Sequence, residues 1–185
     1  MEGELIIISG PSASGKTVIV RSLLAKVKDS TRLVTVTTRD PRPGEVDGRD
    51  YFFIKRDEFL KRVKEGDFFE HAEVYGNLCG SSKTVIESSL KKYSKVFAVV
   101  DIKGAKSLKQ KVSRSTTIFI KPGSLDDILR RLKSERRTTP QNELDVRMKA
   151  VAEECALADS FDHVVTNVEG KLDQTVSDIL KIIGC

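Results

Sequence analysis

The sequence predicts an α/β protein in which helices cover both faces of a parallel sheet. Apolar runs of strand length alternate with segments of helical periodicity along most of the 185 residues, which is the order that a parallel sheet requires. The run at residues 96–100 is apolar at every position, as is typical of a strand that is buried on both faces. A chain of this length is expected to form one globular unit with a sizeable core.

The first predicted strand, residues 5–8, leads directly into a phosphate-binding sequence pattern. Residues 10–17 fit G-x-x-x-x-G-K-[ST], and a predicted helix follows at residues 18–24. In such a loop the backbone N–H groups point inward at a helix N-terminus, where an anion is favoured, while the lysine reaches the β- and γ-phosphates and the threonine hydroxyl meets Mg²⁺. The pattern therefore predicts a nucleoside triphosphate site. Its residues are Gly10, Pro11, Ser12, Ala13, Ser14, Gly15, Lys16 and Thr17.

The middle of the chain is predicted to be a β-rich insertion. Strands are expected at residues 33–37, 51–54 and 68–75, and the last of these is closed by a turn at Gly76 and Asn77. A polar, proline-rich stretch, residues 39–50, separates the first two strands. A short helix at residues 57–65 is expected to turn Phe59, Leu60 and Val63 toward the core.

Alternation then resumes to the end of the chain. Helices are predicted at 83–92, 105–111, 125–132, 143–158 and 172–183, and strands at 96–100, 116–120 and 163–165, with a polar surface loop at 133–142. Asp101 ends the strand 96–100, at the carboxyl edge where open α/β sheets bind ligands. Its position alone supports a turn or cap as well as it supports a carboxylate that orients the waters around Mg²⁺. The phosphate loop favours the second interpretation.

Composition narrows the class of protein without identifying its reaction. The formal net charge is +5, but basic and acidic residues are interleaved, and no aromatic-plus-basic module that would bind nucleic acid is present. No apolar stretch approaches the length of a membrane span, and the acidic start lacks the basic flank of a secretory signal, so a cytoplasmic protein is expected. The three cysteines have no metal-binding or disulfide spacing, so reduced thiols are expected.

The insertion carries the most specific pattern in the chain. Arg39 and Arg42 lie three residues apart in a segment stiffened by Pro41 and Pro43, so two guanidinium groups suited to a phosphate are held with little conformational freedom. On these residues alone, two exposed arginines are more often solvated or paired in surface salt bridges. Residues 37–51 closely resemble the TTR-x-PRPGE-x-DG-x-DY signature of the guanylate kinase family. The order of phosphate loop, signature, Glu70 and Ser81 is similar to that family over essentially the whole chain.

The resemblance implies a role for each matching residue. In this family the glutamate at the position of Glu70 accepts hydrogen bonds from the guanine N1–H and amine, and hydroxyls at the positions of Thr35 and Ser81 contact O6. The residues that match Arg39, Arg42 and Tyr51 hold the phosphate of GMP. A buried carboxylate would be mispaired against adenine, which presents a lone pair at N1. Cys79 and Asp101 match further GMP-binding positions of the family. Arg136 and Arg147 match the arginines of its lid, and Asn167 matches a position near the adenine of ATP. Arg137 is a rival for Arg136, and Thr17 and, through water, Asp101 are expected to hold Mg²⁺.

Three positions depart from the family pattern. Cys79 replaces a tyrosine whose hydroxyl binds phosphate in the family, His71 replaces a tryptophan, and Lys103 replaces a glutamine. None of them removes a group that Mg-ATP needs. His71 is expected to be a packing substitute and not a base, since phosphoryl transfer depends mainly on positioning and electrostatics.

The expected architecture is therefore a P-loop kinase core with a five-stranded parallel sheet, an inserted GMP-binding subdomain and a helical lid. The predicted core is 1–36, 82–125 and 148–185, the insertion is 37–81 and the lid is 126–147. The expected activity is transfer of the γ-phosphoryl group of ATP to GMP, and to dGMP, in purine recycling, with Mg²⁺ and no nucleic-acid or membrane partner. A catalytically silent protein-binding domain and a GTPase are the alternatives, and the oligomeric state stays open. The intact phosphate loop argues against the first, and the absence of an N-K-x-D motif argues against the second.

Overall fold

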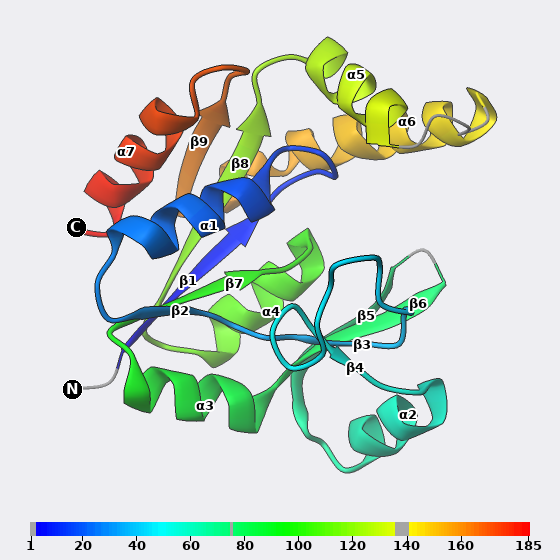
Figure 1. The fold of residues 1–185 in the computed structure, drawn as a ribbon, viewed down its shortest axis with the longest axis vertical. Coiled ribbons are helices and arrows are strands. Elements are labelled where there is room, and N and C mark those ends of the chain that lie inside the picture. Colours follow the sequence, from blue (N-terminus) through cyan, green and yellow to red (C-terminus); the bar gives the residue numbers. More distant parts are fainter. Residues whose placement is uncertain (1–2, 75, 136–140) are drawn as a thin grey trace.

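A five-stranded, all-parallel sheet forms the centre of the molecule. The computed structural model describes residues 3–74, 76–135 and 141–185 (Figure 1). The strands lie in the order β2-β7-β1-β8-β9, and every neighbouring pair is parallel, so the predicted five-stranded parallel sheet is confirmed. The strands are β1 (Glu4–Ser9), β2 (Ser30–Arg32), β7 (Lys95–Val99), β8 (Ser115–Pro122) and β9 (His163–Asn167).

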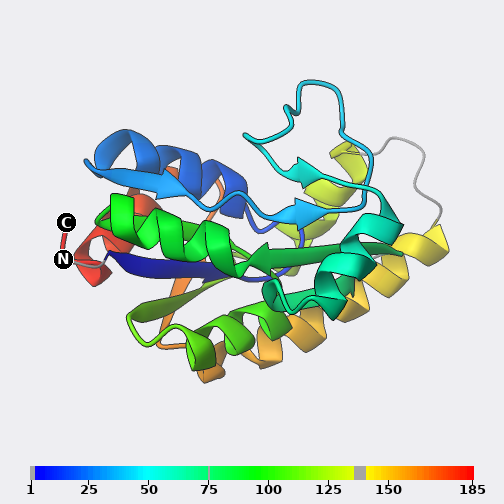
Figure 2. The same cartoon turned by 90° about the horizontal axis from the view of Figure 1, so that it is seen from below.

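Helices cover both faces of this sheet because the strands bury side chains on both sides. On β1, Ile6 and Ile8 pack with α1 (Lys16–Lys26) and α7 (Leu172–Ile182), whereas Leu5 and Ile7 pack with α3 (Lys83–Lys92) and α4 (Ile102–Lys111). Alternate residues of a strand point to opposite faces, so the continuous apolar run of β1 supplies both cores. Figure 2 shows the sheet between its helical layers.

A second, four-stranded sheet lies beside the first. Its order is β4-β3-β6-β5, in which β3 and β4 are parallel and the other pairs are antiparallel. The ring of Phe59, on the adjoining helix, stacks on that of Phe68 with 4.6 Å between centroids, inside a small core that also contains Val36 and Leu78. The elements are β3 (Val36–Thr37), β4 (Phe52–Phe53), α2 (Arg56–Lys64), β5 (Phe68–Val74) and β6 (Asn77–Ser82).

In this region one predicted strand was wrong and one strand was missed. The predicted strand 33–37 is divided: β2 ends at Arg32, and the chain crosses to the second sheet, where β3 begins at Val36. Leu33 stays in the core of the large sheet and Val36 enters the core of the small one, so the apolar run serves two cores. The predicted turn is present at Gly76, whose φ is 79°, but Asn77 already begins β6. The sequence did not reveal β6 because Asn-Leu-Cys-Gly-Ser-Ser has little strand preference and is held by pairing with β5 and β3.

Two helices pack over the phosphate loop from the other side. They are α5 (Leu125–Glu135) and α6 (Gln141–Ala156), followed by the short 3₁₀ turn η1 (Ala158–Ser160). Ile128, Leu144 and Val151 form a buried cluster against which Ala13 of the loop packs. Figure 1 shows α5 and α6 on one side of the β1–α1 connection and the second sheet on the other. No helix in the described part of the chain is long and apolar enough to cross a bilayer.

Candidate active site

The loop between β1 and α1 has the backbone that a phosphate cradle requires. Gly10, Ala13 and Gly15 have φ values of 139°, 60° and 93°, and Gly15 is the N-cap of α1, which begins at Lys16. The Lys16 ammonium group folds back and donates to the carbonyl oxygens of Gly10 and Pro11, each at 2.7 Å. The loop therefore offers the N-terminus of α1 to an anion, and the Lys16 ammonium group beside it is held by two carbonyl oxygens of the loop itself.

Two side chains fasten the loop from outside. Asn167, at the end of β9, is 7% exposed; its Nδ2 donates to the Ser14 carbonyl at 2.8 Å, and its Oδ1 accepts from the Thr175 hydroxyl at 3.2 Å. A Cβ on Gly15 would lie 2.5 Å from that amide nitrogen, so the close approach needs glycine. Arg131, from α5, donates through Nη1 to the Ala13 carbonyl at 3.1 Å.

Two cavities meet at the loop. The first, which we call the P-loop cavity, has a volume of about 530 Å³ and lies against Gly15, Thr17, Arg131 and Asn167. The second, the Glu70 cavity, has a volume of about 350 Å³ and is lined by Thr35, Glu70, Cys79, Asp101 and Glu154. Five residues line both cavities: Ser12, Lys16, Arg42, Tyr51 and Val99. The arrangement can hold two ligands whose ends meet at Lys16.

The inner end of the Glu70 cavity is acidic. The Ser81 hydroxyl donates to Glu70 Oε1 at 2.5 Å, and a Cβ on Gly104 would lie 3.0 Å from Oε2, so glycine leaves room for the carboxylate. Burial, together with repulsion from Asp101, raises the pKa of Glu70. Asp101 Oδ1 also caps α4 by accepting from the Gly104 N–H at 2.6 Å, so the capping interpretation was correct as far as it went. Such a site suits a planar group that presents two N–H donors.

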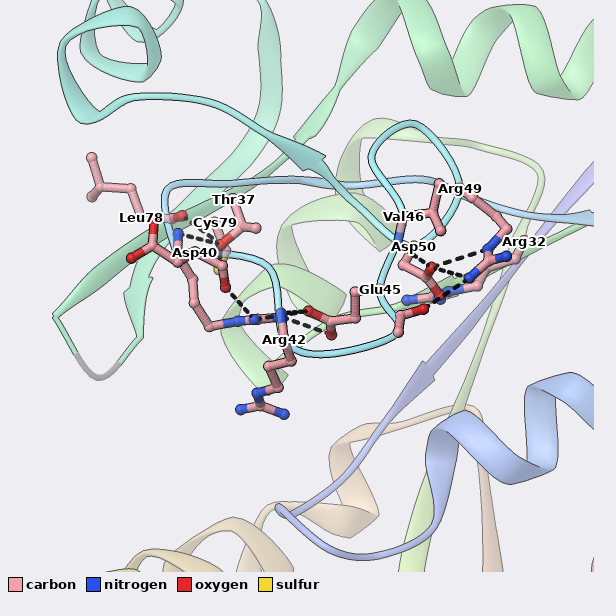
Figure 3. A network of polar contacts seen from close by, with 12 residues as sticks. Arg32, Thr37, Asp40, Arg42, Glu45, Val46, Arg49, Asp50, Leu78 and Cys79 are labelled. Atoms are coloured by element: carbon pink, nitrogen blue, oxygen red, sulfur yellow. Dashed lines mark hydrogen bonds and ion pairs between the residues drawn. The ribbon is translucent and has the colours of Figure 1, made fainter.

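The two arginines of the insertion have different surroundings. Arg42 is exposed and lines both cavities, whereas Arg39 lines neither and forms a bidentate ion pair with Glu45. The Arg39 guanidinium lies over the rings of Tyr51 and Phe53, with its Cζ 5.4 and 5.6 Å from their centroids. Figure 3 shows the Arg42 side chain pointing away from Glu45.

Burial strongly affects the charge of Lys16. It lowers the pKa of the ammonium group to about 8, and the carboxylate of Glu154 opposes this shift. Burial likewise raises the pKa of Glu154, which faces the Glu70 cavity from α6. Neither Glu154 nor Arg131 was among the predicted site residues. Each lies three residues after a buried residue of its helix, Val151 and Ile128, and this spacing places it on the inward face.

The other predicted site residues occupy varied positions. Thr35 and Cys79 line the Glu70 cavity, with Cys79 Sγ 3.4 Å from the Thr37 hydroxyl, whereas Ser81 reaches the site through Glu70. Arg147 is half-buried on α6. Arg136 and Arg137 lie outside the described residues. Gly10 lines the Glu70 cavity, while Pro11 and Ser14 are buried in the loop and contribute backbone.

The donor set agrees with a hard cation that keeps most of its waters. Thr17 is exposed beside the P-loop cavity, and the Asp101 carboxylate lines the adjoining cavity. In the part of the chain that the structure describes, no three His, Cys, Asp or Glu side chains come together as a metal cage. Mg²⁺ is commonly held by one or two protein oxygens together with substrate phosphates, so these residues fit it better than they fit zinc or calcium.

Comparison with known proteins identifies the family. The sequence model described as guanylate kinase matches residues 2–184. The chain belongs to the guanylate kinase family. Guanylate kinase from Thermotoga maritima is 37% identical over 183 residues, covering 99% of this chain and 87% of that protein, and the enzyme from Clostridium perfringens is 41% identical over 165 residues, covering 89% and 76%.

Solved structures agree with this guanylate kinase assignment. The crystal structure of guanylate kinase from Anaplasma phagocytophilum has a TM-score of 0.79 and 29% identity, and the match covers 99% of this chain and 85% of that one. Shikimate kinase from Bacteroides thetaiotaomicron, at 12% identity and a TM-score of 0.55, shares the fold alone. The predicted P-loop kinase core is therefore confirmed.

Proposed function

We propose that the protein transfers the γ-phosphoryl group of ATP to GMP, and less efficiently to dGMP, giving ADP and GDP or dGDP. One observation carries the proposal: Lys16 of the phosphate loop lies where the P-loop cavity and the Glu70 cavity meet. ATP would occupy the P-loop cavity with its phosphates on the loop N–H groups. GMP would occupy the Glu70 cavity with its phosphate directed toward Lys16.

Base selection would follow from hydrogen-bond complementarity at Glu70. The guanine N1–H and exocyclic amine can both donate to the carboxylate, while Ser81 holds one of its oxygens and Thr35 offers a hydroxyl to O6. Adenine would present a lone pair at N1 and a donor at C6, leaving buried groups mispaired. The hydrogen-bonding groups of the cavity thus favour GMP over AMP.

Transfer would depend on positioning and on neutralising charge. A phosphate oxygen of GMP attacks the γ-phosphorus of ATP in line, and Lys16, Arg42 and Arg39 offset the negative charge that spreads over the transferring oxygens. Arg147 and one of Arg136 and Arg137 would complete the charge compensation from the lid. Closure of the lid would exclude water that otherwise hydrolyses ATP.

Mg²⁺ would be held by Thr17 and, through water, by Asp101, and when bound it neutralises charge on the β- and γ-phosphates. Asn167 would support the adenine end of the site by fixing the loop. We assign residues 37–81 to the GMP-binding insertion and residues 126–147 to the lid. A cytoplasmic location, in purine nucleotide recycling, is consistent with these substrates.

A coupled ADP-release assay that offers GMP, dGMP, AMP, UMP and CMP in turn tests the proposal. GMP should be the best acceptor, dGMP should follow, and the other nucleotides should give only background. Lys16→Ala is the control for contaminating kinases, because removing a charge aimed at the transition state should lower turnover about a hundredfold or more. Better turnover with AMP would refute the role of Glu70, and no turnover with any acceptor would favour a binding domain.

A further inference from the structure

Glu45 contacts both Arg39 and Arg42, although the proposed reaction gives it no role. Its two carboxylate oxygens accept from Arg39 Nη1 and Nη2, each at 2.9 Å. Oε2 also accepts from the backbone N–H of Arg42 at 2.7 Å. The side chains of Arg39 and Glu45 are largely shielded from solvent, at 23% and 21% exposure. Figure 3 shows Glu45 against the backbone of Arg42. One carboxylate therefore ties a side chain of the site to the loop that carries it.

The contacts with Glu45 leave part of the Arg39 guanidinium group available to another ligand. A guanidinium group has five N–H donors in a fixed plane. Glu45 takes one from each terminal nitrogen, and the second Nη1 proton goes to the Asp40 carbonyl at 2.6 Å. What remains is the Nε–H and the second Nη2–H. These two protons lie on one edge and point the same way, so Arg39 keeps a complete bidentate edge for a phosphate.

We infer that Glu45 is a positioning residue: it fixes the Arg39 guanidinium by its far edge so that the Nε edge stays available to the phosphate of the acceptor. The inference rests on the proposed function, since it deepens the recognition of that phosphate. The rings of Tyr51 and Phe53 hold the flat face of the same group, so its plane and its in-plane rotation are both fixed. Free rotation of a long arginine side chain would otherwise be lost on each binding event.

The opposite interpretation treats Glu45 as a competitor that occupies the place of the phosphate. The contacts of Glu45 argue against it. Its second partner, the Arg42 N–H, is backbone of the same loop, so the carboxylate would have to break three hydrogen bonds to withdraw. The Nε edge of Arg39 can meet a phosphate with all three of these hydrogen bonds in place.

Calorimetric titration of the full chain with GMP and with guanosine, without ATP, tests the inference. Glu45→Gln keeps the size of the side chain but loses the charge and one acceptor. We expect the Kd for GMP to rise about tenfold while the Kd for guanosine, which has no phosphate, stays within about twofold. Glu73→Gln is the matched control, since it removes a carboxylate that pairs with an arginine of the same subdomain but is 54% exposed, and it should change neither constant.

A double-mutant cycle measures the coupling between Glu45 and Arg39 in GMP binding, which a purely structural role of Glu45 would not produce. In an Arg39→Lys background, Glu45→Gln should have no further effect on GMP binding, because an ammonium group has no second edge to orient. A GMP constant that is unchanged or lower in Glu45→Gln would overturn the inference, as would equal weakening of GMP and guanosine. These constants need no turnover, so failure of the wild type to phosphorylate GMP would count against the proposed function alone.

Discussion

Replacing Asn167 with alanine tests how far the phosphate loop depends on one amide. The Ser14 carbonyl would lose its donor at 2.8 Å in a buried setting, which costs about 1–3 kcal/mol. The Thr175 hydroxyl would lose less, because it also reaches the Lys171 carbonyl at 3.3 Å. A total of about 2–3 kcal/mol should lower the melting temperature by about 5–10 °C in a chain of this size.

Thermal unfolding by circular dichroism, together with steady-state kinetics, measures both consequences. The KM for ATP should rise severalfold while the KM for GMP changes little, since Asn167 holds the loop on which we propose that ATP binds and does not line the Glu70 cavity. Gln174→Ala is the control, because it removes an exposed amide that donates to Asp178 one helical turn away, outside the loop. An Asn167→Ala protein that melts within about 1 °C of wild type, with unchanged ATP kinetics, would show that the loop holds its shape without this contact.

Four further outcomes are expected. Because the pKa of Lys16 is lowered to about 8, the free enzyme loses this charge above that pH, so kcat/KM for ATP should fall about tenfold for each pH unit beyond it, and a profile that stays flat to pH 10 would contradict this. Glu70→Gln should raise the KM for GMP about a hundredfold but also raise the melting temperature of the empty protein at pH 7. The sign follows because a carboxyl pKa that folding raises means that the ionised form destabilises the fold, a penalty that fades as the pH falls; equal melting points would show that the buried charge costs nothing. Ala13→Gly should raise the free energy of unfolding by about 0.5–1 kcal/mol, because φ at Ala13 is 60°, whereas Ala25→Gly within α1 should lower it by a similar amount. Denaturant titration measures both values, and a change in the same direction for the two variants would contradict the prediction. Cys79→Tyr should lower the KM for GMP severalfold, because the tyrosine hydroxyl would donate a hydrogen bond to the GMP phosphate in the Glu70 cavity. A raised KM for GMP with unchanged ATP kinetics would mean that the loop has repacked around the thiol.

The sequence predicted those parts of the site whose signals are local. The phosphate loop needs a strand, a glycine-rich turn and a helix within about twenty residues, and Arg39 and Arg42 lie in one stiff segment, so each is visible as a pattern. The continuous apolar runs likewise gave the parallel core sheet. In these cases the residues that determine the structure are neighbours along the chain.

Contacts between distant segments escaped prediction. The sequence gives no reason for Asn77–Ser82 to be a strand, because its stability comes from pairing with β5 and β3. The division of residues 33–37 between two sheets could not be seen, since both halves of the run are apolar and each enters a different core. Arg131 and Glu154 look like ordinary charges on amphipathic helices until the fold brings them to the loop. Asn167 was expected at the adenine, and its hydrogen bond to Ser14 spans 153 residues of sequence.

The crossing at residues 33–35 has a mechanical consequence. The second sheet is one continuous insertion, so the chain enters it once, after β2, and leaves it once, between Ser82 and α3. Thr35 and Ser81 lie at these two roots, whereas the loop that carries Arg42 lies farther out along the insertion. A rotation about these roots would displace Thr35 and Ser81 little and would displace the loop that carries Arg42 more. The residues that we propose to select the base would therefore stay nearly in place, while the arginine that we propose to bind the phosphate would move toward or away from Lys16.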